Sequence, residues 1–308
     1  MSKELRLGIG GFALTVASVS DNSQFEIEGA YEPFVVDDAG QIMLRVHRCT
    51  AFEEACGDLL FDSGGPWSLH HDRGKRVIYL RSSGSNPGLY QVAILEPDFR
   101  SGDIYSKSQR PDGKLLPFPL RYPLAEVLMM NLLCLGSGVL LHACGVSDHG
   151  RGLLFVGSSG AGKSTMADLW KNGEGVTILS DDRVIVREKE GRFWAYGTPW
   201  HGDARLCSAE SVPLEAIFLI RHGGENSIMR LGEARKAVSS LLVRSFPTFW
   251  NAEGMAFTLE FLHRMSQAVP CYDLGFMPDK SVVQLVRSTG YGYDGLSLPG
   301  QQIGLWHP

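Results

Sequence analysis

The chain has 308 residues, of which 44% are hydrophobic and 20% are charged. This composition is typical of a globular protein that buries a sizeable core, in one large domain or two small ones. The formal net charge is −5, and no lysine- and arginine-rich run of five or more residues occurs. We therefore expect neither a nucleic-acid partner nor a membrane partner.

The cysteines and the apolar stretches predict the compartment. No Cys-x-x-Cys pair or histidine spacing completes a zinc site, and the scattered cysteines are Cys49, Cys56, Cys134, Cys144, Cys207 and Cys271. Residues 1–7 lack the apolar core of a signal peptide. The apolar stretch 127–135 contains Asn131 and is far shorter than a membrane span. We expect a cytoplasmic protein with reduced thiols and a buried helix over 127–135.

Residues 1–115 are predicted to form a β-rich, largely antiparallel N-terminal region. Short runs of β-favouring residues are separated by turn formers, at 12–16, 25–27, 42–46, 76–80 and 90–94. The polar stretch 101–115 is interpreted as a connector. Because the region carries no catalytic motif, recognition of a substrate or partner is the hypothesis for it.

Residues 116–308 are predicted to form a second domain in which strands and helices alternate. Pro123, near a first turn, favours a helix over 123–133, and further helices are predicted at 232–246 and 255–267. Strands are expected at 139–146, 154–156, 176–179, 183–186, 192–196, 214–220 and 271–274. This order predicts an α/β (α+β) domain.

The segment after residues 154–156 is the most informative. It reads Gly157, Ser158, Ser159, Gly160, Ala161, Gly162, Lys163, Ser164 and Thr165, the G-x-x-x-x-G-K-[ST] motif between a predicted strand and helix. Its glycines let backbone N–H groups turn inward on phosphates, beside the positive end of the helix. Lys163 would reach the β- and γ-phosphates, and the Ser164 hydroxyl would ligate Mg²⁺. An ordinary glycine-rich turn is the alternative, and the Lys-Ser-Thr ending argues against it.

Two adjacent carboxylates end the predicted strand 176–179. Asp181 and Asp182 follow Lys163 by only eighteen and nineteen residues, which implies a short helix and a tight return strand. Beside a Mg²⁺–triphosphate, one carboxylate can hold the metal while the other accepts a proton from an attacking hydroxyl. The alternative is an Asp-Asp turn that caps a strand.

The loop 197–205 is dense in turn formers and reactive side chains. Asp203 could add a metal or water ligand, His201 a donor to the substrate, and Arg205 a stabilising charge. Proline and glycine restrict such a loop, so ordering it around a ligand costs less entropy. A surface turn with a packed Trp200 is an equal alternative.

Two further candidates rest on weaker patterns. His142 precedes Gly157 by fifteen residues on an apolar strand, where a lone histidine is more often a satisfied core residue than a catalytic one. Arg244 and the aromatic-rich segment 245–250 could form a lid or a wall beside the nucleotide. Core packing at a helix end is the favoured interpretation of that segment.

Together, residues 141–142, 157–165 and 180–184 resemble the catalytic domain of HPr kinase/phosphorylase, which shares its P-loop fold with ATP-dependent phosphoenolpyruvate carboxykinase. The resemblance covers roughly residues 123–290. It implies a P-loop kinase domain of that type, preceded by a smaller β-rich region. It also implies an active-site role for His142, Asp181 as the base and Asp182 as the metal partner, although the order of the two aspartates stays open.

The chain also departs from that family. In the bifunctional enzymes, a glycine-rich signature with an acidic residue and an arginine follows the Asp-Asp segment and serves phosphorolysis. Here the corresponding loop is 198–203, where Asp203 is at best a substitute. The chain looks instead like the scattered HPr-kinase-related proteins linked to peptide-modification or small-molecule clusters, some of which phosphorylate a serine of a ribosomal peptide.

The leading hypothesis is an ATP- and Mg²⁺-dependent kinase that transfers the γ-phosphoryl group to a hydroxyl of a peptide, a protein or a small molecule. The alternative is a nucleotide-dependent binding module or switch with slow ATPase activity. Carboxykinase-like chemistry ranks last because the sequence offers no second basic cluster for a dicarboxylate. HPr kinases form hexamers, so a homo-oligomer is an open expectation.

Overall fold

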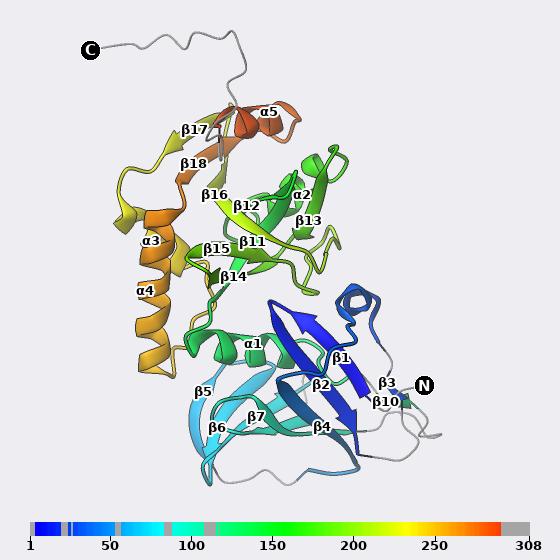
Figure 1. Ribbon diagram of the computed structural model, residues 1–308. Coiled ribbons are helices and arrows are strands. Elements are labelled where there is room, and N and C mark those ends of the chain that lie inside the picture. Colours follow the sequence, from blue (N-terminus) through cyan, green and yellow to red (C-terminus); the bar gives the residue numbers. More distant parts are fainter. Residues whose placement is uncertain are drawn as a thin grey trace, which may run out of the picture.

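The computed structural model describes residues 4–19, 24–25, 27–52, 57–82, 88–107, 115–116 and 118–290. These residues form a mixed α/β protein with two large β-sheets, and helix α1 (Leu124–Cys134) lies between them (Figure 1). No helix among them is long and apolar enough to cross a membrane. The five described cysteines are free, whereas Cys56 lies outside the described residues.

The N-terminal sheet has eight strands, in the order β1 (Glu4–Ile9), β2 (Phe12–Ser18), β4 (Ile42–Cys49), β9 (Ser101–Lys107), β8 (Leu89–Leu95), β7 (Lys75–Arg81), β6 (Trp67–Asp72) and β5 (Asp58–Asp62). Only the pairs β2–β4 and β4–β9 are parallel. The largely antiparallel β-rich region is therefore confirmed, with four predicted runs inside β2, β4, β7 and β8. The fifth run, 25–27, meets the short strand β3 (Gln24–Phe25), which pairs with β10 (Leu115–Leu116). Ile27 lies beyond β3, and Glu26 lies outside the described residues.

The predicted connector 101–115 is wrong over its first half. Residues Ser101–Lys107 form β9, which lies inside the sheet between β4 and β8. Its inward positions are Gly102, Ile104 and Ser106, so a single large apolar residue marks its buried face. The sequence of this segment therefore resembles a polar loop, although β9 is a central strand that pairs with a neighbour on each edge. Residues 108–114 of the predicted connector lie outside the described residues.

The second sheet is built on two long strands. β11 (Val139–Asp148) pairs with β12 (Arg151–Val156) along one edge, and with β14 (Arg183–Lys189) and then β13 (Val176–Ser180) along the other. β16 (Ser211–His222) pairs with β15 (Arg192–Tyr196), β12 and β18 (Cys271–Phe276), and β17 (Ser227–Arg230) forms the last strand. β12, β16 and β18 are mutually parallel. The predicted strands of this part are confirmed, whereas β17 was not predicted.

Four helices follow or flank this sheet, α2 (Lys163–Trp170), α3 (Ala234–Leu242), α4 (Ala252–Ala268) and α5 (Ser281–Ser288). The predicted helix at 232–246 is shorter in the structure, whereas the one at 255–267 begins earlier. Asn251 explains this earlier start, because its side chain accepts hydrogen bonds from the backbone N–H groups of Glu253 and Gly254.

Helix α1 joins the cores of the two parts. Its apolar residues belong to the core that the N-terminal sheet forms, together with Leu140, Ile185 and Trp200 of the second part. The predicted buried helix is thus confirmed over α1, with Leu135 half-exposed at its end. The predicted domain boundary at residue 115 stays a prediction. Helix α1 follows this boundary in the sequence but packs on the N-terminal sheet.

Tyr31 forms a second junction between the parts. It lies in the short 3₁₀ helix Gly29–Phe34, where its buried hydroxyl donates to Leu120 O at 2.8 Å and accepts from Trp200 Nε1 at 3.0 Å. Its ring packs on Phe118 with centroids 4.4 Å apart. These hydrogen bonds fix Trp200, which lies in the predicted loop 197–205.

We expect Tyr31→Phe to keep the ring packing but to lower the free energy of unfolding by about 1–3 kcal/mol, because it leaves Trp200 Nε1 and Leu120 O without their buried partner. Urea unfolding of the full chain measures this change. Tyr105→Phe on the other face of the sheet is the control, with an expected change below about 0.5 kcal/mol. Equal effects of the two substitutions would contradict the importance of this junction.

Candidate nucleotide-binding site

The loop 157–165 has a backbone that only glycine adopts easily. The chain passes from strand β12 through this loop into helix α2, in the order that the sequence predicts. Gly160 and Gly162 have φ of 76° and 100°, in the left-handed region. A Cβ on Gly162 would also lie 2.5 Å from Cζ of Phe276. Gly160 is therefore favoured by its conformation alone, whereas Gly162 is required by both conformation and space.

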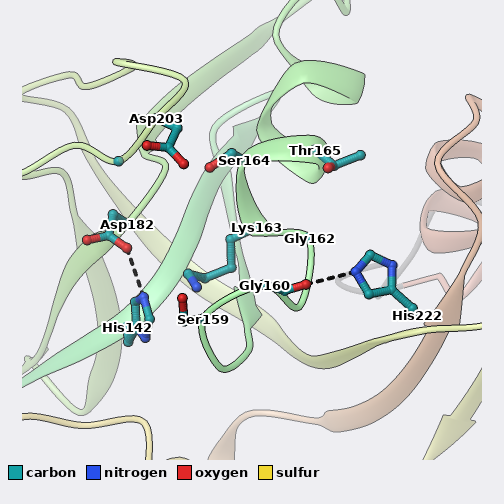
Figure 2. Close-up of a pocket in the computed structure, with 11 residues that line it drawn as sticks. His142, Ser159, Gly160, Gly162, Lys163, Ser164, Thr165, Asp182, Asp203 and His222 are labelled. Carbon is teal, nitrogen blue, oxygen red and sulfur yellow. Dashed lines mark hydrogen bonds and ion pairs between the residues drawn. The ribbon is translucent and has the colours of Figure 1, made fainter.

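A cavity of about 410 Å³ opens in front of this loop. Its lining joins the loop, the end of β13–β14, strand β11 and the loop after β15 (Figure 2). The lining residues are His142, Ser159, Gly160, Gly162, Lys163, Ser164, Thr165, Asp182, Gly202, Asp203 and His222. The structure therefore brings the P-loop motif, His142, one aspartate of the pair and Asp203 to one place.

Lys163 curls back over its own loop. Its Nζ donates to Ser158 O at 3.1 Å and to Gly157 O at 3.3 Å, and the residue is 7% exposed. Burial lowers the pKa of its ammonium group, and the carboxylate of Asp182 opposes this shift. The loop thus holds a positive charge on two carbonyl oxygens, which are contacts that an incoming anion could replace.

Asp181 and Asp182 lie in a break between two strands that follow one another along the same edge of β11. β13 pairs with β11 up to Ser180, and β14 resumes the pairing at Arg183. Ser180 Oγ accepts from the backbone N–H groups of Asp182 and Arg183 across this break. The irregular backbone turns the two neighbouring carboxylates in different directions.

Asp181 faces the interior and holds a loop together. Its side chain accepts from the backbone N–H of Gly202 at 2.9 Å, of Ala204 at 2.9 Å and of Leu206 at 3.3 Å. The residue is 1% exposed and does not line the cavity. The Ser164 hydroxyl also donates to it at 3.4 Å. These contacts use both carboxylate oxygens of Asp181, so the carboxylate organises the loop that carries Asp203.

Asp182 faces the cavity and pairs with His142. Its Oδ1 lies 2.8 Å from Nε2 of His142, and its Oδ2 accepts from the guanidinium of Arg183. Burial raises the pKa of the Asp182 carboxyl, but the hydrogen bond from His142 and the positive charge of Arg183 outweigh it and lower the pKa below its usual value. Asp182 is therefore a partly buried carboxylate that stays ionised beside the P-loop.

Glu126 of helix α1 extends this cluster. Its Oε2 lies 3.7 Å from Nε of Arg183, whose guanidinium also stacks 4.4 Å from the ring centre of Phe246. Burial raises the pKa of Glu126 to about 7, against the attraction of Arg183. Four charged or titratable side chains thus form a chain from α1 to His142, although the sequence analysis assigned no role to Glu126 or Arg183.

His222 is a lining residue that the sequence analysis missed. It ends β16, and its Nε2 lies 2.8 Å from Gly160 O, on the opposite side of the loop from His142 (Figure 2). No local motif marks it. The one available signal is topological, because the parallel strands β12 and β16 end at the same edge of the sheet.

The remaining candidates lie around the cavity without lining it. His201 Nδ1 contacts Gly202 O at 3.0 Å, and Arg205 is exposed, with a φ of 55° in the turn. Arg244 contributes its backbone, since its carbonyl accepts from the His142 N–H at 2.7 Å. Of the three, Arg244 is thus tied to the site, through the position of β11.

The oxygen ligands suit only part of a Mg²⁺ shell. Ser164 and Asp203 line the same side of the cavity, and hydroxyl and carboxylate oxygens are donors that Mg²⁺ takes together with phosphate oxygens and water. Across the described part of the chain, no group of three or more His, Cys, Asp or Glu side chains could hold a metal ion. The donor set fits a metal that is bound jointly with a triphosphate.

Residues 124–276 match a family model described as ScmC, SynChlorMet cassette protein ScmC. The match covers just under half of the chain and includes α1, the P-loop motif and the aspartate pair. No curated protein matches the chain. Among solved structures, the Hpr(Ser) kinase/phosphatase from Coxiella burnetii is similar at 12% identity over 50% of this chain and 94% of that chain, with a TM-score of 0.29. A score this low establishes no shared fold.

We expect Asp181→Asn to destabilise the protein by about 2–4 kcal/mol, because an amide has one acceptor oxygen where the carboxylate accepts several N–H groups. Hydrogen exchange of residues 202–206 should increase with it. Asp182→Asn, one residue away, is the matched control and should leave the exchange of this loop unchanged. If Asp182→Asn opened the loop equally, the division of roles between the two aspartates would be refuted.

Glu126 makes stability depend on pH. Because its pKa is raised from 4.5 to about 7 in the folded protein, its neutral form contributes stability that is complete below about pH 4.5 and is lost as the pH rises through about 7. The unfolding free energy of Glu126→Gln minus that of the wild type should therefore increase by about 1–3 kcal/mol when the pH is raised from 5 to 8. Urea unfolding at both pH values measures the gain. The exposed Glu260→Gln should gain nothing, and a pH-independent difference for Glu126→Gln would contradict the raised pKa.

Proposed function

We propose that the chain is a kinase of the HPr kinase type, which binds ATP with Mg²⁺ at the loop 157–165 and transfers the γ-phosphoryl group to a hydroxyl. One observation carries the proposal. A glycine-rich loop that opens helix α2 and the Asp182–His142 pair line the same cavity. Phosphoryl transfer needs positioning and charge stabilisation more than covalent chemistry, and this lining supplies groups for both.

The loop would hold the phosphates. Helix α2 begins at Lys163, so its first backbone N–H groups and its positive end point toward the cavity. Lys163 would exchange the carbonyls of Gly157 and Ser158 for phosphate oxygens, which accept a charged donor more strongly. Burial lowers the pKa of the lysine in the present state, and a bound anion would raise this pKa again.

The metal would be held by Ser164 and Asp203, which line the cavity. Asp181, which does not line it, would orient the Ser164 hydroxyl by accepting its hydrogen bond. When bound there, Mg²⁺ would supply positive charge that offsets the negative charge on the phosphates during transfer. Asp181 thus contributes through Ser164 and through the loop that carries Asp203. This assignment exchanges the roles that the resemblance implied for the two aspartates.

Asp182 would take up the proton of the acceptor hydroxyl. As the acceptor oxygen forms its bond to the γ-phosphorus, the bond from that phosphorus to the β–γ bridging oxygen breaks and ADP leaves. The acceptor proton passes to the Asp182–His142 pair, where Asp182 is the anion and His142 holds its Oδ1 at 2.8 Å. A positioned carboxylate of low pKa suffices because a loose transition state develops little negative charge on the attacking oxygen.

The phosphate acceptor stays a prediction, and it is predicted only as a hydroxyl on a peptide, a protein or a small molecule. The absence of nucleic-acid and membrane partners, the cytoplasmic location and a homo-oligomeric state are also expectations from the sequence. None of them is needed for the chemistry at the cavity.

We expect Asp182→Asn to reduce phosphoryl transfer by about 10²–10⁴-fold while ATP affinity changes less than about threefold, because it removes the proton acceptor but no phosphate contact. Lys163→Met should weaken ATP binding at least tenfold. Labelling from γ-³²P-ATP with Mg²⁺, using size-sorted lysate fractions as acceptors, measures transfer, and calorimetry measures binding. Asp168→Asn, on the exposed side of α2, is the control.

The result also separates the alternative function. If the wild type binds ATP but labels no acceptor, and Asp182→Asn leaves its slow hydrolysis unchanged, a nucleotide-dependent switch replaces the kinase. If ATP with Mg²⁺ does not bind to the wild type, both functions fail.

A further inference from the structure

We propose that Arg183 is the positioning residue of the Asp182–His142 pair and that Glu126, together with Phe246, holds Arg183 in place. This inference rests on the proposed function for its catalytic consequence, whereas its geometric content stands alone. Arg183 does not line the cavity, so it would act only through the carboxylate that does.

The guanidinium of Arg183 is enclosed by three contacts of different kinds. It donates to Asp182 Oδ2, lies 3.7 Å from Glu126 Oε2 and stacks on the ring of Phe246 at 4.4 Å. Its side chain is 17% exposed. A planar guanidinium can face two carboxylates and an aromatic ring at once, whereas an ammonium group cannot match this geometry.

These contacts fix the orientation of Asp182. One of its oxygens is held by His142 and the other by Arg183, so the carboxylate plane has no free rotation. The backbone of Arg183 is itself fixed, because its N–H donates to Ser180 Oγ and its carbonyl accepts from Thr198 Oγ1 at 2.6 Å. Loss of the guanidinium would free the side chain of Asp182 while leaving its backbone in place.

Glu126 ties this arrangement to the N-terminal part of the chain. It lies on α1, whose apolar residues pack in the core of the N-terminal sheet. His142 and Arg183 are direct cross-strand partners on β11 and β14. Asp182 and Arg183 therefore both come from the second sheet, whereas Glu126, which lies beside Arg183, comes from the helix that joins the two parts.

Arg187 provides a matched control on the same strand. Like Arg183, it is half-buried and stacks 4.4 Å from an aromatic ring, in its case that of Phe12. It donates to the carbonyls of Ser137 and Gly10. A lysine at either position costs comparable packing, but only Arg183→Lys disturbs Asp182.

The first experiment measures turnover and binding separately. We expect Arg183→Lys to lower kcat by about 10–100-fold with an ATP Kd within about threefold of the wild type, because a misplaced catalytic group loses rate without losing phosphate contacts. Arg187→Lys should change neither quantity.

At pH 8, Glu126→Gln should lower kcat in the wild type but cause no further loss in an Arg183→Met background, because Glu126 acts through Arg183. Additive losses would overturn the proposal.

The second experiment does not depend on activity. In the NMR spectrum of the full chain with ¹⁵N-labelled histidine, the His142 Nε2–H that is bonded to Asp182 should give a downfield signal, assigned by its loss in His142→Gln. It should shift or broaden in Arg183→Lys and stay unchanged in Arg187→Lys. An unchanged signal in Arg183→Lys would refute the positioning role even if the wild type proves to have no kinase activity. Should Arg183→Met not fold, Arg183→Gln takes its place as the background in which Glu126→Gln is measured.

Discussion

The buried carboxylate of Asp181 is the constraint on which the site depends. A carboxylate with 1% exposure is costly unless several donors satisfy it, and here backbone N–H groups of residues 202–206 and the Ser164 hydroxyl do so. One charge therefore binds the end of β13, the loop after β15 and the P-loop together. Asp203 reaches the cavity because Gly202 and Ala204 on either side of it are tied to Asp181.

The two neighbouring aspartates show how environment divides one motif into two roles. Asp181 has only neutral donors around it and stays inside, whereas Asp182 has His142 and Arg183 and stays at the cavity. The balance is electrostatic. Burial alone would raise the pKa of Asp182, and a hydrogen bond and a neighbouring positive charge lower it. For Glu126, the effect of burial outweighs the attraction of Arg183, whose Nε lies 3.7 Å away. The pKa of Glu126 therefore rises to about 7.

The sequence predicts what depends on local spacing and fails where distant contacts decide. The motif 157–165 and the aspartate pair are local patterns, and both lie where such patterns place them, at strand ends beside one cavity. The order of the two aspartates depends on the N–H groups of a loop twenty residues further on. Strand β9 was missed because its own buried face holds Gly102 and Ser106 beside a single large apolar residue, Ile104. Glu126 and His222 carry no motif, and only topology brings them near the P-loop.

The junction between the two parts explains why a β-rich region without catalytic motifs precedes such a site. The contacts that join them include α1 in the shared core, Tyr31 on Trp200, and Arg187 on Gly10. Two of these lead toward the cavity, since Trp200 lies in the loop that carries Asp203 and α1 places Glu126 beside Arg183. A Cβ at Gly10 would lie 2.5 Å from Ile185, so the third contact admits no side chain. The loop that carries Asp203 and the helix that carries Glu126 are therefore both packed against the N-terminal part of the chain.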